Sequence, residues 1–246
     1  MKKLALIIFG SSLIFGGVVK NFNVNSKTVA TLKANNGVVE VVVNGKKQLL
    51  KKMNKNTFNN LLSMGSSALF EIKDFNFDGN KDIAVSSGSV GYGGVNNYKD
   101  YYFYSPIRKS YYLAGKNINS LQVVGKKLVS YTKDGPFTYE NSYGIKNGKL
   151  YKKLSSVDFG ILKRITLFNS SGKKLRDYFE PSTLTITAKK AYFYNLPKES
   201  AKSRVYVIKG DKVRVLDYKP FDRWIKIEYK SPKKIFRSWI KQDSVE

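Results

Sequence analysis

Short runs of β-forming residues alternate with turn signals along most of this chain of 246 residues. The clearest turn signals are Asn44-Gly45 and Asn147-Gly148, and each lies between two strand-like runs. Asn-Gly favours the two-residue turn of a β-hairpin because both residues tolerate positive φ angles. Further turn signals recur about every eight to twelve residues, a spacing typical of all-β domains. The sequence therefore predicts an all-β protein built as a meander.

A proline marks the predicted boundary between two domains. Glu180-Pro181-Ser182 interrupts the strand pattern, and the rhythm of the sequence changes after it. We expect residues 21–180 to form one β domain and residues 183–246 to form a second, smaller one. The polar residues 21–34 are expected to be a loose lead-in to a strand at 38–43, and residues 57–62 a helical turn or a loop.

Residues 74–82 place acidic or amide side chains at alternate positions, with a glycine after the third: Asp74, Asn76, Asp78, Gly79, Asn80 and Asp82. Ca²⁺ takes six to eight oxygen ligands, and alternate residues of a tight loop turn their side chains towards one centre. Glycine permits the sharp turn that this loop requires. We predict that Asp74, Asn76, Asp78 and Asp82 are side-chain ligands and that Asn80 contributes its backbone carbonyl.

The loop is shorter than an EF-hand loop. Its twelfth position, where an EF-hand has a bidentate glutamate, is Val85, and a strand-like run follows in place of a helix. The pattern is typical of the Asp-x-Asn-x-Asp-Gly-x-x-Asp loops that connect strands. A plain Asp/Asn-rich surface turn is the alternative reading.

The first twenty residues have the pattern of a bacterial secretory signal peptide. Met1-Lys2-Lys3 precedes a mostly apolar run at 4–19 and then Lys20. The run is shorter than the ~20 residues of a membrane-spanning helix. Cleavage near Gly17, cleavage after Ala30 and retention as an uncleaved anchor all stay open. We expect an extracytoplasmic protein, for instance a periplasmic one.

The chain contains neither cysteine nor histidine. It therefore has no disulfides, and Ser-His-Asp triads, Cys-His dyads and the usual zinc sites are excluded. A glycosidase would need two paired carboxylates, and Glu40, Glu71, Glu140 and Glu180 lie in no motif that pairs them. We expect that the protein is not an enzyme.

The formal net charge is +26. In a cytoplasmic protein this charge would favour nucleic acid as a partner. Because the chain has a signal-like start and no long basic block, we expect no nucleic acid partner. An anionic partner in the cell envelope, or a basic bias that aids solubility, explains the charge better. A membrane association is expected only through an uncleaved signal segment.

Residues 38–155 resemble the calcium-binding periplasmic immunity proteins that protect bacteria from peptidoglycan-hydrolase effectors of cell-killing secretion systems. The segments that carry the resemblance occur in this order: the loop 74–82, Gly91-Tyr92-Gly93-Gly94, the tyrosine-rich 101–104, residues 126–130, and Tyr143 with Asn147-Gly148-Lys149-Leu150. The resemblance implies a β-propeller-like fold and inhibition of a peptidoglycan hydrolase. This chain departs from many periplasmic relatives in having no cysteine.

Residues 183–246 resemble a bacterial SH3 domain, which is a small barrel. The resemblance rests on the Lys209-Gly210-Asp211 turn, the strand that begins at Trp224 and the closing Trp239-Ile240. It implies a contact with cell-wall peptides or with a partner protein. An alternative function is therefore a peptidoglycan-binding protein of the cell envelope that inhibits no enzyme.

Six aromatic side chains are considered as candidate partner contacts. Tyr92 lies among glycines and is the best single candidate. Trp224 and Trp239 could line a groove of the SH3-like domain, although at least one is expected in its core. Tyr101, Tyr102 and Tyr104 could contribute to an inhibitory face, but we favour a core position for each because strand side chains alternate between faces.

Overall fold

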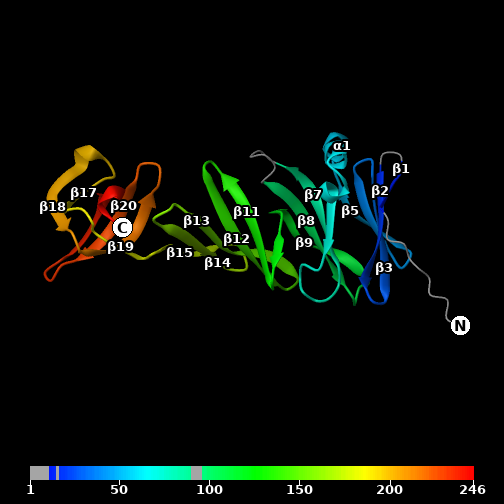
Figure 1. Cartoon of the computed structure of the whole chain (residues 1–246). Coiled ribbons are helices and arrows are strands. Elements are labelled where there is room, and N and C mark those ends of the chain that lie inside the picture. Colours follow the sequence, from blue (N-terminus) through cyan, green and yellow to red (C-terminus); the bar gives the residue numbers. More distant parts are fainter. Residues whose placement is uncertain (1–10, 15–16, 90–95) are drawn as a thin grey trace. The chain divides into compact units, whose positions relative to one another are not determined.

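The computed structural model describes residues 11–14, 17–89 and 96–246 (Figure 1). The first strands and helices are β1 (Ser11–Ile14), β2 (Gly17–Asn25), β3 (Thr28–Asn35), β4 (Val38–Val43), β5 (Lys46–Lys52), α1 (Lys55–Ser63), α2 (Ser66–Leu69), β6 (Phe70–Lys73), β7 (Asp82–Ser89), β8 (Asn97–Ser105) and β9 (Ser110–Asn119). The strands that follow are β10 (Gln122–Val124), β11 (Lys127–Asp134), β12 (Phe137–Lys146), β13 (Lys149–Asp158), β14 (Lys163–Phe168) and β15 (Lys174–Glu180). The last are β16 (Thr183–Thr185), β17 (Lys190–Tyr194), β18 (Lys202–Ile208), β19 (Lys212–Lys219), β20 (Trp224–Lys230) and β21 (Ile235–Lys241).

The predicted all-β class is confirmed. The strands form four antiparallel sheets, with the orders β1-β2-β3-β4-β5, β6-β7-β8-β9, β10-β11-β12-β13-β14-β15 and β16-β19-β20-β21-β17-β18. In the first three sheets each strand pairs with the next one in the chain, as a meander requires. Among the described strands no sheet closes on itself, because the first and last strands of each order are not paired with each other. The sheets are therefore open, and neither a closed barrel nor a closed propeller is formed.

The expectation of a loose lead-in at residues 21–34 is wrong. These residues lie in β2 and β3, which pair with each other from Gly17↔Asn35 to Asn25↔Thr28. Their apolar residues alternate with polar ones, so that one face of the hairpin is buried and the other faces water. The buried residues are Val18, Phe22, Val24, Ala30, Leu32 and Ala34. The alternation of apolar and polar residues, rather than the overall polarity of the segment, indicates that these residues form strands.

Part of the predicted signal peptide also lies in this sheet. Residues 11–14 form β1, which pairs with β2 from Ser11↔Lys20 to Ile14↔Gly17. Within the ranges that the structure describes, no helix is long and apolar enough to cross a membrane. Export by a signal peptide stays a prediction.

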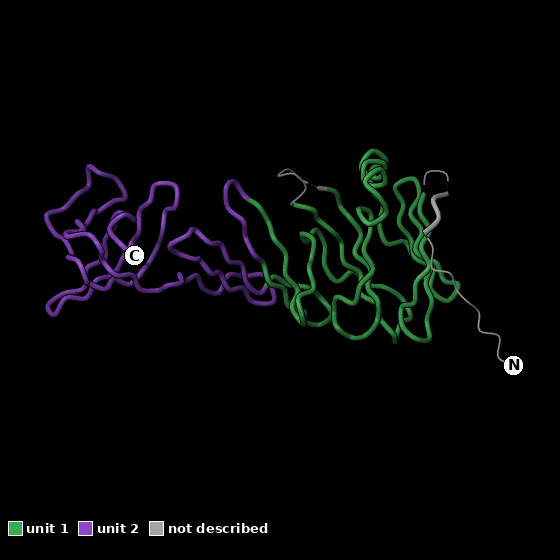
Figure 2. Tube along the Cα trace, viewed as in Figure 1, with its two compact units in different colours: residues 1–133, 141–152 green, residues 134–140, 153–246 purple. Residues whose placement is uncertain are grey.

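The chain divides into two compact units, coloured green and purple in Figure 2. Unit 1 comprises residues 1–133 and 141–152, and unit 2 comprises residues 134–140 and 153–246. The divisions fall within the strands β11, β12 and β13.

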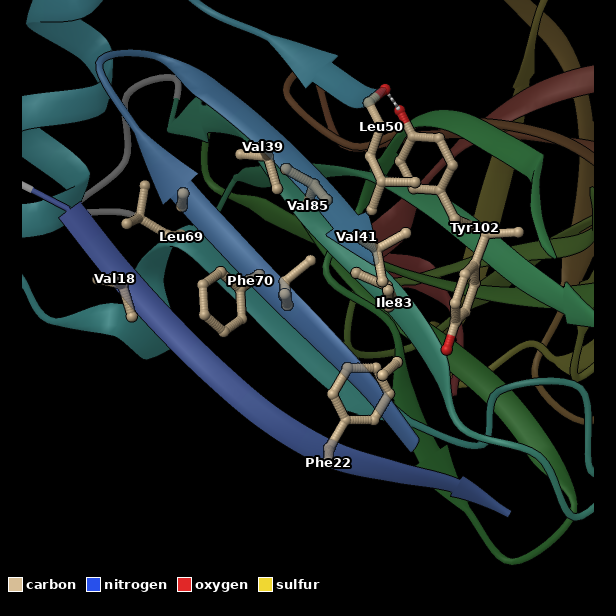
Figure 3. Packing of buried hydrophobic residues seen from close by; sticks show 14 of the residues in the cluster. Val18, Phe22, Val39, Val41, Leu50, Leu69, Phe70, Ile83, Val85 and Tyr102 are labelled. Carbon is tan, nitrogen blue, oxygen red and sulfur yellow. Dashed lines mark hydrogen bonds between the residues drawn. The ribbon is translucent and has the colours of Figure 1, made fainter. Parts of the chain in front are cut away.

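The main core of unit 1 combines the first sheet with strands β6, β7 and β8 (Figure 3). Val39 and Val41 from β4 and Ile83 and Val85 from β7 are all fully buried. The Tyr102 hydroxyl donates a hydrogen bond of 2.5 Å to the carbonyl oxygen of Leu50, which Figure 3 draws as a dashed line. A buried tyrosine needs such a partner for its hydroxyl group.

A second core of unit 1 lies around Phe75, the second residue of the predicted calcium loop. Phe75 and Tyr101 are both fully buried and pack edge to face, with ring centroids 5.1 Å apart. Ala84, Phe103, Leu121 and Leu128 complete the cluster with Ala114. The predicted core position of Tyr101, Tyr102 and Tyr104 is confirmed, since all three are buried.

The core of unit 2 includes residues on both sides of Pro181. Leu162 and Phe179 precede Pro181 and pack in one cluster with residues from the segment 183–246. These include Leu184, Ile186, Val213, Ile225, Ile227 and Ile240. Leu162 is 1% exposed. The apolar face of the last sheet is therefore covered in part by residues that precede the predicted second domain.

We predict that Leu162→Ala lowers the free energy of unfolding of unit 2 by about 2–5 kcal/mol, because it leaves a cavity in a packed core. The measurement is urea unfolding of the full chain, followed by tryptophan fluorescence, since both tryptophans (224 and 239) lie in unit 2. The matched control is Leu175→Ala, because Leu175 is 64% exposed and should change stability by less than about 0.5 kcal/mol. Equal effects of the two substitutions would contradict this packing.

Candidate metal centre

The loop 74–82 connects β6 to β7, which pair from Phe70↔Val85 to Lys73↔Asp82. Asp74 is the first residue after β6, and Asp82 is the first residue of β7. The two strands of one hairpin therefore hold the two ends of the loop side by side. All five predicted ligand residues lie within this short connection.

The first half of the loop is a series of turns in which side-chain oxygens accept bonds from backbone N–H groups. Asp74 accepts from the N–H groups of Asp78 at 3.2 Å and Gly79 at 2.9 Å. Asn76 Oδ1 accepts from the N–H of Asp78 at 3.1 Å, and Asp78 Oδ1 accepts from the N–H of Asn80 at 2.8 Å. These local bonds hold Asp74, Asn76 and Asp78 around one curved segment of backbone.

Two residues of the loop have left-handed backbone conformations. Gly79 has a φ of 84° and Phe77 a φ of 63°. A Cβ built on Gly79 would meet no atom within 4 Å, so space does not require glycine there. The backbone conformation does, because positive φ is strained for most other residues. The predicted role of Gly79 in a sharp turn agrees with this geometry.

Asp82 differs from the other predicted ligands because it is fully buried. One carboxylate oxygen, Oδ1, accepts from the N–H of Tyr104 at 3.0 Å. The other, Oδ2, accepts from the N–H groups of Phe75 at 2.9 Å and Asn76 at 3.2 Å. Asp82 thereby connects the start of the loop, β7 and β8. Sequence reasoning did not predict this anchoring role.

The environment of Asp82 has two opposing effects on its ionisation. Burial raises the pKa of its carboxyl group to about 7, although the bond from the N–H of Tyr104 and then that of Phe75 act in the other direction. The charge of Asp78 also acts to raise the pKa and is included in that value of about 7. Removing the Asp82 carboxylate from water is therefore costly, and the three N–H donors offset part of that cost.

The end of the loop is attached to the first sheet. Asn80 is buried, and its Oδ1 accepts from Asn25 Nδ2 at 2.8 Å. The N–H of Lys81 donates to the carbonyl oxygen of Val24 at 2.8 Å, and the carbonyl of Lys81 accepts from the Tyr111 hydroxyl at 2.9 Å. The loop is therefore fixed to β2, which sequence reasoning had placed in a loose segment.

The oxygen donors of Asp74, Asn76 and Asp78 fit a calcium ion by residue type and by their position on one turn. Across the described ranges, no three side chains of the acidic, histidine and cysteine types gather as a ready-made metal site. A cation in this loop would therefore depend on amide and backbone oxygens as well as on carboxylates. Asp82 would support the loop through its bonds to N–H groups.

Of the predicted partner contacts, the two tryptophans are buried in unit 2. Tyr92 lies outside the described residues. Trp224 and Trp239 are 6% and 8% exposed and pack in a small cluster with Tyr194. The Trp224 ring lies edge-on to Tyr194, with centroids 4.6 Å apart. Trp239 also lines a surface hollow with Asn195, Lys226 and Arg237, so it combines a packing role with access to the surface.

We predict that Asp82→Asn lowers the free energy of unfolding by about 1–3 kcal/mol. The NH₂ group of the asparagine would point at a buried backbone N–H, and two donors cannot form a hydrogen bond with each other. The measurement is urea unfolding with a chelator present, so that bound metal does not contribute. Asp158→Asn is the control, because Asp158 accepts one bond from Gly160 in an exposed turn and an amide oxygen can replace it. A change for Asp82→Asn no larger than that for the control would contradict the anchoring role.

No family model matches the chain, and no curated protein matches it. Among solved structures, the chain is similar to one described as the structure of a Xanthomonas Type IV Secretion System related protein. The match has a TM-score of 0.43 and 20% sequence identity, and it covers 71% of this chain and 95% of the other.

Proposed function

We propose that the chain is an exported, calcium-stabilised protein that inhibits a peptidoglycan hydrolase and is not itself an enzyme. The observation that carries the proposal is the loop 74–82, whose side-chain oxygens and left-handed residues agree with a calcium loop between strands. The order of motifs in residues 38–155, which resembles periplasmic immunity proteins, adds the inhibitory role.

The proposed metal ligands are Asp74, Asn76 and Asp78 through their side chains and Asn80 through its backbone carbonyl. Calcium would neutralise two carboxylates that otherwise repel each other, and it would strengthen the connection between β6 and β7. Asp82 is part of the predicted ligand set, and its bonds to Phe75, Asn76 and Tyr104 support the loop whether or not it also contacts the ion. The metal therefore has a structural role in this proposal.

We further infer that residues 183–246 are an SH3-like module and that the preceding meander is related to a propeller. Support for the module comes from its C-terminus, which returns to its first strand. Thr185 and Glu246 exchange two backbone hydrogen bonds of 3.1 Å each, and Ile186 forms a bridge with Val245. The start of the module is thus flanked by β19 on one side and by residues 244–246 on the other.

A specific observation also favours the second candidate, a peptidoglycan-binding protein of the cell envelope without inhibitory activity. The hollow beside Trp239 lies on unit 2 and is lined by this indole, Lys226 and Arg237 among others. Such a site could take an acidic cell-wall peptide without any contribution from unit 1. In this function the calcium loop would only stabilise its own unit.

Calcium should raise the melting temperature of unit 1, because an ion that binds the folded loop better than the unfolded chain stabilises the folded state. At a calcium concentration of about 100 times Kd the gain in stability is about 2.7 kcal/mol. Asp78→Ala should abolish the response, since it removes a central carboxylate and leaves the turn at Gly79 intact. The measurement is differential scanning calorimetry with calcium and with a chelator.

The control for that experiment is Asp222→Ala, which removes one exposed carboxylate from unit 2. It should keep the full calcium response. An unchanged melting curve of the unaltered protein in calcium and in chelator would exclude the metal site.

The inhibitory role is tested separately, with purified protein and a panel of peptidoglycan hydrolases acting on isolated cell walls. The proposal expects a stoichiometric loss of activity of at least one hydrolase. Retention of the protein by purified peptidoglycan, without inhibition of any hydrolase in the panel, would favour the envelope-binding function instead.

A further inference from the structure

The outward face of the last sheet is strongly basic. Val213 and Val215 of β19 and Ile225 and Ile227 of β20 point into the core of unit 2, so the alternate residues point outward. After the bulge between Val215 and Asp217, Asp217 pairs with Lys226 on that outward face. Its basic residues are Lys212, Arg214, Lys219, Lys226, Lys230, Arg237 and Lys241, against two acidic ones, Asp217 and Glu228. One face of four strands thus has a large excess of positive charge.

A row of polar residues crosses this face at right angles to the strands. Thr183 pairs with Arg214, Arg214 with Glu228, and Glu228 with Arg237, on the neighbouring strands β16, β19, β20 and β21. The Arg214 Nε and Nη2 atoms lie 3.2 and 3.0 Å from Glu228 Oε1. Arg237 Nε lies 2.9 Å from Glu228 Oε2. One carboxylate therefore holds two guanidinium groups.

This arrangement leaves the guanidinium groups available for a further anion. The Glu228 side chain is 5% exposed, whereas those of Arg214 and Arg237 are 57% and 64% exposed. The bond from Arg237, together with those from Arg214, holds the pKa of Glu228 below its usual value. Glu228 thus stays ionised and fixes both arginines, and each arginine keeps unused N–H donors that face solvent.

Two hollows lie on either side of this row. The first, of about 570 Å³, is lined by Thr183, Lys212, Arg214, Glu228 and Lys230. Within the part of the chain that the structure describes, neither Lys212 nor Lys230 forms an ion pair. Two exposed cations without acidic partners beside a fixed arginine make a site for a negatively charged group.

The second hollow, of about 470 Å³, lies further along the sheet. Lys226, Arg237 and Trp239 line it together with Asp217, whose carboxylate lies 3.4 Å from Arg164 Nη2. The ammonium groups of Lys219 and Lys226 lie 5.6 and 5.9 Å from the centre of the Trp239 ring. Both hollows share the arginine row between them, so the cations form one continuous track rather than an isolated site.

Two neighbouring basic hollows fit a ligand that carries several anionic groups in succession. Non-specific binding of single-stranded nucleic acid relies on exposed aromatic platforms for base stacking, and the two tryptophans of this face are buried. Insertion into a lipid surface relies on a cluster of exposed apolar side chains. On strands β16, β19, β20 and β21 the only exposed large apolar residue is Ile235. Neither nucleic acid nor a membrane is therefore favoured.

We propose that the outward face of β16, β19, β20 and β21 binds a linear polymer that carries phosphate groups along its backbone and no nucleobases. Arginine forks and lysine ammonium groups both donate to phosphate oxygens, and the row of Arg214, Glu228 and Arg237 fixes the centre of the track. This surface lies wholly in unit 2, so the proposal does not depend on the calcium loop or on inhibition of a hydrolase.

The test is a titration of fluorescently labelled long-chain inorganic polyphosphate with the full-length protein, followed by fluorescence anisotropy at several salt concentrations. The unaltered protein should bind, and the double variant Lys212→Gln, Lys230→Gln should bind about tenfold more weakly, a change of about 1.4 kcal/mol. The plot of log Kd against log salt concentration should become less steep by about two, one for each lysine removed.

The matched control is the double variant Lys173→Gln, Lys189→Gln. It makes the same change in net charge at two exposed lysines of unit 2 outside the strands of this face. The control should bind as tightly as the unaltered protein. Equal weakening by the two double variants would show an effect of net charge only and would overturn the proposal. Tighter binding to single-stranded DNA, to polyglutamate or to anionic lipid vesicles than to polyphosphate would overturn it as well.

Discussion

The buried carboxylate of Asp82 is the interaction on which the arrangement of unit 1 depends. It accepts three backbone N–H groups, from Phe75 and Asn76 in the loop and from Tyr104 in β8. An unpaired charge at a fully buried position would be very unfavourable, and the three N–H donors lower the pKa of Asp82 against the effect of burial. The carboxylate therefore constrains the loop, β7 and β8 relative to one another. The edge-to-face contact of Phe75 with Tyr101 follows from the same arrangement.

Buried charge is used in the same way elsewhere in unit 1, each time with a partner. Lys51 Nζ lies 2.6 Å from Asp100 Oδ2, with side chains that are 14% and 7% exposed. Asp100 Oδ1 accepts from the N–H of Asn117 at 2.9 Å. Removing either member of such a pair leaves the other buried and unpaired. These contacts join β5, β8 and β9.

Unit 2 uses charge differently, at its surface. Glu228 is enclosed by Arg214 and Arg237, but both arginines extend into solvent. The inward-facing residues of the same strands form an apolar core. Strand alternation thus lets one sheet combine a stable interior with a face that presents positive charge. The loop 74–82 and the basic face are two distinct candidate sites in separate units.

Sequence alone determined the all-β class, the hairpin turns and the alternate spacing of oxygen side chains in 74–82. These properties are local, because Asn-Gly turns, Gly79 and period-two patterns act over a few residues. The tertiary structure decided what those patterns contact. It placed residues 21–34 in a sheet, showed that Asp82 accepts bonds from β8 and put Leu162 in the core of unit 2. It also aligned Arg214, Glu228 and Arg237 from three strands. Each of these depends on strand register between distant segments, and a one-residue change of register would turn every side chain to the opposite face.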